Sequence, residues 1–293
     1  MPINILLTGA NGLLGRAISQ YCTHDQSISC HSLTRSELDI TNRQQIATTL
    51  DALKPDWVIN TAAYVNTEGA EENPELAFAV NDQGAKNLAI ATHECHIPLV
   101  HFSSDYIFDG KKDTPYNEND IPAPLNVYGQ SKWQGECAIA TEQPEHLIFR
   151  VSWIFGSQGR NFVKTIAQLA RTKPTLQVVA DQIGAPTPAD DIAAMVIDVI
   201  KKRSQGKGQW GTYNYCATPA LSWYEFAVQI VEIMHRLDPN TSLATITPVT
   251  SEQYITKAKR PLTSRLYTDK IYHDYGVLIQ PWLPALEAIL RDS

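Results

Sequence analysis

The stretch NVYGQSK at residues 126–132 contains a tyrosine and a lysine four positions apart, Tyr128 and Lys132. On a helix, residues at i and i+4 share a face, and their Cβ atoms lie about 5 to 6 Å apart. A phenol with a pKa of about 10 is poorly matched to proton transfer at neutral pH, but a neighbouring ammonium favours tyrosinate and lowers that pKa. The pair is therefore a candidate for acid and base chemistry, although YxxxK also arises by chance on unrelated surfaces.

A hydroxyl group at the end of a candidate strand could act together with this pair. Ser104 follows the apolar run PLVHFS at residues 98–103. Ligands of parallel α/β sheets bind beyond the carboxyl ends of the strands, so a hydroxyl there could hold a carbonyl oxygen near the phenol. We therefore predict that Ser104, Tyr128 and Lys132 are the catalytic residues.

A glycine motif, GANGLLG at residues 9–15, follows the apolar run INILLT near the N-terminus. Gly9 would permit a tight turn, Gly12 would let backbone N–H groups approach a pyrophosphate, and Gly15 would let a helix pack on a strand. Because the motif follows a strand and opens a helical pattern, it predicts a dinucleotide site rather than an ordinary turn. The GxxGxxG spacing favours the short-chain dehydrogenases over ordinary dehydrogenases.

Arg35 lies about twenty residues beyond the glycines, where a carboxylate often binds the adenosine ribose. A guanidinium there suits a 2′-phosphate through bidentate charge-assisted hydrogen bonds, so the sequence favours NADPH and leaves NADH open. In the alternative interpretation Arg35 is solvated, and Glu37 or Asp39 contacts the adenosine instead.

These motifs need elements that hold them at one edge, and the chain alternates strands with helices. Helical spacing occurs at residues 42–53 and 75–93. The alternation predicts an α/β fold, a Rossmann-type doubly wound parallel sheet with a smaller C-terminal lobe. The expected strands are residues 3–8, 28–33, 57–61, 98–103 and 146–152.

The pattern loosens after about residue 155. Ser222 and Glu225 form a capping-box pattern at the start of a predicted helix, and PALEAILRD predicts a short helix near the C-terminus. The other expected elements are strands at 176–180 and 211–216 and helices at 191–202 and 222–237. We expect a dinucleotide-binding domain of residues 1–157 and 188–217, and a substrate-binding lobe of residues 158–187 and 218–293.

Composition limits the classes of partner. The 293 residues are 43% hydrophobic, which supports a sizeable core, and the net charge of −7 argues against a nucleic-acid surface. The five cysteines are scattered and never form CxxC, which indicates free thiols in a reducing compartment. No apolar run approaches the roughly 18 residues of a membrane helix. We therefore expect a cytoplasmic protein without nucleic-acid or membrane partners.

Four stretches resemble the extended short-chain dehydrogenases and, more narrowly, the dTDP-4-dehydrorhamnose reductases: GANGLLG, SSDYIFDG, NVYGQSK and RVSWIFG. Two further stretches, DQIGAPTPADDIA at residues 181–193 and RPLTSRL at 260–266, are more discriminating. The resemblance covers nearly the whole chain. It implies NADPH-dependent reduction of the C4 keto group of dTDP-4-dehydro-L-rhamnose to dTDP-L-rhamnose.

The resemblance also implies roles by matching position. Ser104 would hydrogen-bond the sugar C4 carbonyl, Tyr128 would protonate it, and Lys132 would bind the nicotinamide ribose. The implied substrate site comprises Ser104, Asp105, Tyr106, Trp153, Asn161 and Arg260. The expected cofactor site comprises Gly9, Asn11, Gly12, Leu13, Leu14, Gly15, Arg35, Asp39, Ile40, Thr61, Ala62, Ala63, Tyr64, Tyr128 and Lys132.

The chain departs from the family pattern at two places. Ser104 stands where threonine is common, which keeps the hydroxyl. The segment AYVNTEGAE stands where the family usually reads close to AYTAVDKAE, so Gly69 replaces a lysine and Thr67-Glu68 replaces Val-Asp. That segment borders the substrate opening and bears on which sugar is bound.

Other functions of the same lineage stay open at this point. They are reduction or epimerisation of another nucleotide-linked 4-keto-6-deoxyhexose, and regulation of a partner by a non-catalytic NADP-binding subunit. A 4,6-dehydratase needs additional carboxylates beside the hydroxyl residue, whereas Ser104 is followed by Asp105 alone. Certain relatives are described as magnesium-dependent dimers, but Glu287 and Asp292 form no recognisable ligand set. We therefore predict no metal ligands and leave Mg dependence and a homodimer open.

Overall fold

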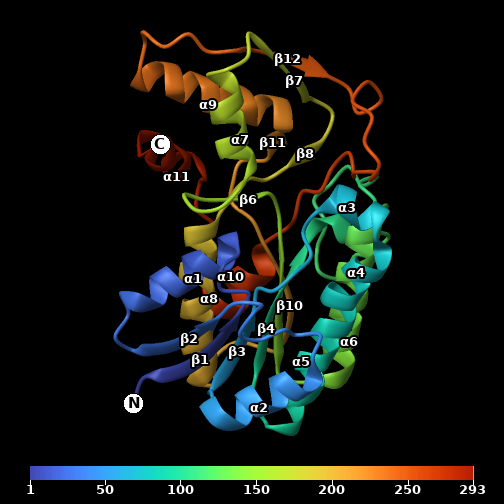
Figure 1. Cartoon of the computed structure of the whole chain (residues 1–293), viewed down its shortest axis with the longest axis vertical. Helices are drawn as coiled ribbons and strands as arrows, with labels where there is room; N and C mark the ends of the chain where they lie inside the picture. Colours follow the sequence, from blue (N-terminus) through green and yellow to red (C-terminus); the bar gives the residue numbers. More distant parts are fainter. Residues whose placement is uncertain (293) are drawn as a thin grey trace.

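A parallel sheet of six strands forms the centre of the molecule in the computed structural model, which describes residues 1–292 (Figure 1). Its strands are β1 (Ile3–Thr8), β2 (Ile28–Leu33), β3 (Trp57–Asn60), β4 (Leu99–Ser104), β5 (His146–Val151) and β10 (Gly211–Tyr215). They lie in the order β2-β1-β3-β4-β5-β10, and every neighbouring pair is parallel. The predicted doubly wound parallel sheet is confirmed. The strand order reverses at β1, so a crevice is expected beyond the carboxyl ends of β1 and β3.

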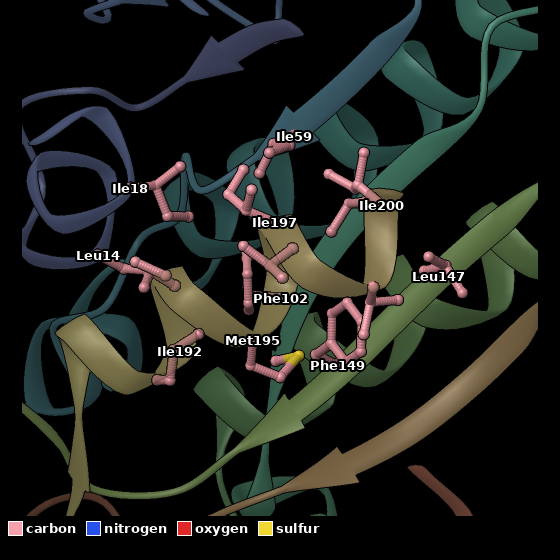
Figure 2. Packing of buried hydrophobic residues seen from close by; sticks show 14 of the residues in the cluster. Leu14, Ile18, Ile59, Phe102, Leu147, Phe149, Ile192, Met195, Ile197 and Ile200 are labelled. Atoms are coloured by element: carbon pink, nitrogen blue, oxygen red, sulfur yellow. The ribbon is translucent and has the colours of Figure 1, made fainter. Parts of the chain in front are cut away.

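Helices cover both faces of the sheet because its strands are apolar on both sides. Ile5 and Leu7 point into one core with α1 and α8, whereas Leu6 points into another with α2 and α5. Figure 2 shows Ile197 of α8 near Phe102 of β4 in the first core. The helices on that face are α1 (Leu13–Thr23), α8 (Ala189–Ser204) and α10 (Asp269–Tyr275). Those on the other are α2 (Arg43–Leu53), α5 (Ala85–Glu94) and α6 (Val127–Glu142).

The helix expected at residues 75–93 is interrupted, so that prediction was partly wrong. Residues 74–78 form α4 (Pro74–Phe78), residues 79–84 form a π-helical turn, and α5 follows. The buried side chain of Asn81 lies in this turn and bonds both backbone groups of Tyr64, accepting from N–H at 2.8 Å and donating to the carbonyl at 3.0 Å. A single extra residue per turn is typical of π-bulges near functional sites, and here it directs an amide toward the end of β3.

A smaller lobe with its own apolar core lies beyond the carboxyl ends of the strands (Figure 1). Its core contains Val163, Phe226, Ile230 and Leu286, and its α9 begins with the predicted capping box. The lobe contains α7 (Phe162–Ala170), β7 (Thr175–Val179), α9 (Trp223–Leu237), β12 (Thr245–Val249) and α11 (Leu283–Arg291). The elements α7 and β12 were not predicted.

The remaining elements are short and lie near the boundary between the sheet and the lobe. They are α3 (Thr67–Glu72), β6 (Ile154–Phe155), β8 (Ile183–Gly184), β9 (Thr187–Pro188) and β11 (Leu221–Ser222), with a 3₁₀ turn at residues 105–107. Among the helices of residues 1–292, none combines the length and apolar character needed to cross a lipid bilayer.

Truncation of Ile197 tests the packing of α8 on the sheet. Ile197 is 1% exposed, so Ile197→Ala removes buried methyl groups and should lower the free energy of unfolding by about 2 to 5 kcal/mol. The matched Ile197→Val change should lower it by about 0.5 to 1.5 kcal/mol. Urea denaturation monitored by circular dichroism measures both values. Equal effects of the two substitutions would contradict the described packing.

Candidate active site

Two adjoining cavities lie at the carboxyl ends of β1, β3 and β4. The first, here called the inner cavity, has a volume of about 340 Å³ and is lined by Ser104, Tyr128, Lys132 and Trp153. The second, the outer cavity, has a volume of about 270 Å³ and is lined by Arg35 among others. The two share Gly12, Thr61 and Ala63 in their walls. The chain thus brings the predicted catalytic residues and the glycine motif together.

The glycine turn after β1 packs too closely on the end of β3 for any side chain. Gly9 has a φ of 71°, and a Cβ there would lie 2.5 Å from the backbone nitrogen of Ala62. A Cβ on Gly15 would lie 2.3 Å from the carbonyl oxygen of Gly9. Both positions therefore require glycine, which holds α1 directly behind the turn.

The N-terminus of α1 has no side-chain cap. Asparagine side chains cap five helices, whereas α1 begins at Gly12 with no side-chain cap. The first N–H groups of a helix need partners, and the positive end of the helix dipole attracts anions. The turn and the start of α1 therefore fit a pyrophosphate.

The outer cavity collects most of the residues expected to contact a cofactor. Arg35 keeps 68% of its side chain exposed and pairs with Asp39 at 3.3 Å, and both line the cavity. The carboxylate of Glu37 instead accepts hydrogen bonds from Thr34, and Glu37 does not line this cavity. An exposed ion pair is worth little, so the guanidinium can exchange Asp39 for another anion. The residues that line the outer cavity are Gly9, Asn11, Gly12, Arg35, Leu38, Asp39, Ile40, Thr61, Ala62, Ala63, Tyr64 and Val80. Leu13 and Leu14, which were also expected to contact the cofactor, line the inner cavity instead.

Lys132 is buried under the inner cavity, with 2% of its surface exposed. Its Nζ donates to the carbonyl oxygen of Phe102 at 2.5 Å and lies 3.3 Å from Nε2 of His101. Burial lowers the pKa of Lys132 to about 8, against a smaller opposing effect of Glu136. Lys132 can therefore exchange a proton near neutral pH, unlike an exposed lysine.

Tyr128 is partly buried, and its pKa does not shift as expected. Removal of the phenol from water raises the pKa of Tyr128 to about 12, a hydrogen bond with Ser104 lowers it, and the charge of Asp105 raises it. The expected lowering by Lys132 was wrong for this arrangement because desolvation dominates. The ring of Tyr106 meets that of Tyr128 edge-on at a centroid distance of 6.0 Å. Tyr128 thus keeps its proton at neutral pH and can act as a donor.

Asp105 orients the hydroxyl of Ser104. Ser104 Oγ donates to one carboxylate oxygen of Asp105 at 3.0 Å and accepts from the N–H of Tyr106 at 3.1 Å. Ser152 Oγ donates to the other oxygen of Asp105 at 3.1 Å. Burial raises the pKa of Asp105 to about 6, although the hydrogen bonds from Ser264, Ser104 and Ser152 lower it. Both oxygens of Asp105 are thus engaged by the protein itself.

Trp153 is held in a strained conformation at the wall of the inner cavity. Its φ of 44° is rare for a bulky residue. Its ring stacks on that of Trp223, with centroids 3.4 Å apart and planes 7° from parallel. A Cβ on Gly184 would lie 2.3 Å from the Trp153 ring, so only glycine fits there. Backbone strain maintained by such tight packing is common at binding sites.

Two other residues of the expected substrate site lie apart from the inner cavity. Asn161 caps α7 by accepting from the N–H of Lys164 at 3.2 Å, and its amide donates to the carbonyl of Gly156 at 2.8 Å. Arg260 pairs with Glu68 at 2.7 Å and lines a third cavity of about 350 Å³, here called the lobe cavity. Arg260 is thus placed to meet a ligand, whereas the side chain of Asn161 serves the local fold.

Asn60 and His101 are buried beside the site and were not predicted. Asn60 ends the apolar strand β3 and His101 lies within β4, and a polar residue in a buried strand is the signal that could have identified them, because buried polar groups require partners. Within residues 1–292, no cluster of three or more His, Cys, Asp or Glu side chains could hold a metal ion. Glu287 pairs instead with Arg236.

Comparison with known proteins gives consistent matches over the whole chain. A family model described as RmlD substrate binding domain matches residues 3–293. The dTDP-4-dehydrorhamnose reductase of Aggregatibacter actinomycetemcomitans is 39% identical over 97% of both chains, and that of Sinorhizobium fredii is 35% identical over 96% of this chain and 94% of its own. The crystal structure of the dTDP-4-dehydrorhamnose reductase from Bacillus anthracis in complex with NADP is 33% identical, covers 100% of both chains, and has a TM-score of 0.92.

The raised pKa of Asp105 predicts a pH-dependent contribution to stability. The folded chain binds this proton more tightly than the unfolded chain, so this contribution is lost as pH rises from about 4 to about 6. The free energy of unfolding of the wild type, relative to that of Asp105→Asn, should fall by up to about 3 kcal/mol across this window. Urea denaturation of both proteins between pH 4 and pH 7 measures the difference. A difference that stays constant or rises with pH would refute the assignment.

Proposed function

The chain belongs to the dTDP-4-dehydrorhamnose reductase family, and from that premise we propose how its own residues carry out the reaction. The enzyme reduces the C4 keto group of dTDP-4-dehydro-L-rhamnose to dTDP-L-rhamnose with NADPH. The observation that carries the residue assignment is the meeting of Ser104, Tyr128 and Lys132 in the inner cavity beside the glycine turn.

The cofactor site fits NADPH on the chemistry of its residues. The Bacillus anthracis relative, solved with NADP, supports the same cofactor here. The uncapped start of α1 suits the pyrophosphate, and Arg35 suits a 2′-phosphate. The reduced nicotinamide supplies a hydride when it is bound. In this proposal the residues from Thr61 to Tyr64, in the wall of the outer cavity, line the cofactor.

Tyr128 donates its phenolic proton to the carbonyl oxygen at C4. A pKa raised by desolvation keeps the phenol protonated at neutral pH, as a general acid requires. The same desolvation makes the resulting tyrosinate unfavourable unless a cation is near. Lys132 lies one helical turn further along α6 and supplies that cation, so its protonated form is the active one.

Ser104 has a defined hydrogen-bond direction at the start of the reaction. Its proton points to the carboxylate of Asp105, and its oxygen accepts from the N–H of Tyr106. Ser104 can donate to the C4 oxygen only when its hydroxyl turns away from Asp105. We therefore assign Asp105 the role of holding Ser104 rather than of contacting the sugar.

The substrate is bound between the two parts of the chain. We assign residues 1–157 and 188–217 to the cofactor and residues 158–187 and 218–293 to the substrate. The ring of Trp153 is the contact for the sugar, and Arg260 is the cation for the anionic nucleotide part in the lobe cavity. The reduced state of all five cysteines supports a location in the cytoplasm.

Replacement of Tyr128 tests the proton donor. Tyr128→Phe should lower kcat by about 10²-fold or more, because no other group can protonate the C4 oxygen as well. The assay follows NADPH absorbance with dTDP-4-dehydro-L-rhamnose, and circular dichroism checks the fold. Gln130→Ala, an exposed change on the same helix, should retain the wild-type rate. Retention of most activity by Tyr128→Phe would refute the assignment.

Replacement of Arg35 tests the choice of cofactor. Arg35→Ala should raise the KM for NADPH about tenfold to a hundredfold, which is the value of a charge-assisted hydrogen bond, and leave the KM for NADH nearly unchanged. Steady-state assays with both cofactors in parallel measure these constants. The control Asp39→Asn should not raise the KM for NADPH, since it removes the carboxylate that competes for the guanidinium. An equal loss with both cofactors would count against a 2′-phosphate contact.

A further inference from the structure

We propose that His101 is a positioning residue for Lys132. The ring of His101 directs an N–H group at Lys132 Nζ and thereby disfavours the ammonium form of Lys132 relative to the amine. The inference rests on the proposed function, in which Lys132 supports proton transfer by Tyr128. It gives a role to Asn60 and His101, two buried residues of β3 and β4 that the mechanism above does not use.

The orientation of the Asn60 amide follows from its backbone partner. One terminal atom of Asn60 lies 3.1 Å from the N–H of Ala62 and 2.7 Å from Oγ1 of Thr8. A backbone N–H can only donate, so this atom is the oxygen Oδ1. The other atom is therefore Nδ2, a donor, and it lies 3.0 Å from Nδ1 of His101.

The Asn60 amide in turn decides which ring nitrogen of His101 carries the proton. Nδ1 must accept from Asn60, so a neutral ring is protonated at Nε2. A doubly protonated ring would direct Nδ1–H at the Asn60 NH₂ group, which cannot accept it. Burial also disfavours the charged ring, because it holds the pKa of His101 well below its usual value. His101 therefore points Nε2–H toward Lys132.

Lys132 meets this N–H group at 3.3 Å. An ammonium has three donors and no acceptor, so it is repelled there, whereas a neutral amine has a lone pair that accepts. The carbonyl of Phe102 holds Nζ in place at 2.5 Å, and His101 is only 1% exposed, so neither group can turn away freely. The contact thus adds to burial in favouring the amine.

The other charged groups around Lys132 are largely neutralised by their own partners. Glu136 on α6 favours the ammonium, but Arg150 of β5 binds both of its carboxylate oxygens, at 2.8 to 3.2 Å. Tyr128 on α6 is neutral at working pH, and Asp105 after β4 is held by serine hydroxyls. His101 is thus the remaining group from which the balance between the two forms of Lys132 can be set.

The consequence is an easily transferred proton at Lys132. When Tyr128 gives its proton to the C4 oxygen, Lys132 Nζ passes a proton to the tyrosinate and becomes an amine. That amine accepts a hydrogen bond from His101 Nε2–H, so the product of the transfer is stabilised by the contact that destabilised the ammonium. Lys132 then regains a proton from solvent.

The first test is the pH dependence of kcat/KM. In the wild type, kcat/KM should fall at high pH as Lys132 loses its proton, at a pH of about 8, which is the pKa of Lys132 in the free enzyme. The His101→Gln variant lets an amide oxygen face Lys132 without adding charge. In Asn60→Asp the new carboxylate still accepts from Thr8 and from the N–H of Ala62, and it moves the His101 proton to Nδ1. Each should shift the basic limb upward by about one unit. An unmoved basic limb in both folded variants would reduce His101 to a structural role and overturn the proposal.

The second test needs no activity. NMR of protein labelled with ¹³C and ¹⁵N, with the His101 ring assigned in the wild type through its backbone signals, should show a neutral ring protonated at Nε2. A ring protonated at Nδ1, or an imidazolium near neutral pH, would overturn the proposal even if the variants fail to fold. A wild type that never oxidises NADPH with the keto-sugar would instead count against the proposed function, and the tautomer would still judge His101.

Discussion

Exclusion of water from the ends of β3 and β4 is the constraint on which the rest of the site depends. His101, Asp105 and Lys132 are each no more than 2% exposed. A buried polar group without a partner costs a few kcal/mol, so each of these side chains must be matched by a donor or acceptor fixed in the protein. The matching makes the site rigid, and the same lack of water moves the pKa values that proton transfer uses.

Close backbone packing complements this buried polar layer. The glycine turn lies against the end of β3, and Gly184 lies against the ring of Trp153. In each contact, backbone or ring atoms fill the space that a side chain on the glycine would occupy. The cavity walls are therefore fixed by van der Waals contact rather than formed by flexible groups. The left-handed conformation of Trp153 persists because Trp223 and Gly184 leave the ring no alternative position.

The sequence was sufficient for the sheet, for the glycine turn and for the meeting of Ser104, Tyr128 and Lys132 at one cavity, because these follow from local pattern and from the rule that strand ends converge. It was not sufficient for the pKa of Tyr128, since the desolvation of a phenol depends on tertiary packing that a local pattern does not reveal. The π-helical turn around Asn81 escaped prediction because one extra residue barely alters helical spacing. The elements α7 and β12 were missed because they are short and gain their stability from the lobe core rather than from local signals.

The segment in which this chain departs from its family joins the two parts of the molecule. Glu68 in α3 accepts from Arg260 and from the N–H of Lys257, so it ties the nucleotide domain to the lobe cavity. A Cβ on Gly69 would lie 2.4 Å from the hydroxyl of Tyr64, a residue of the outer cavity, so the lysine usual in the family would require Tyr64 to move. Within this segment Glu68 holds Arg260 of the lobe cavity, and Gly69 leaves room for Tyr64 of the outer cavity. The segment therefore contacts residues of both the lobe cavity and the outer cavity, whereas Lys132 is held from below by His101 and the carbonyl of Phe102.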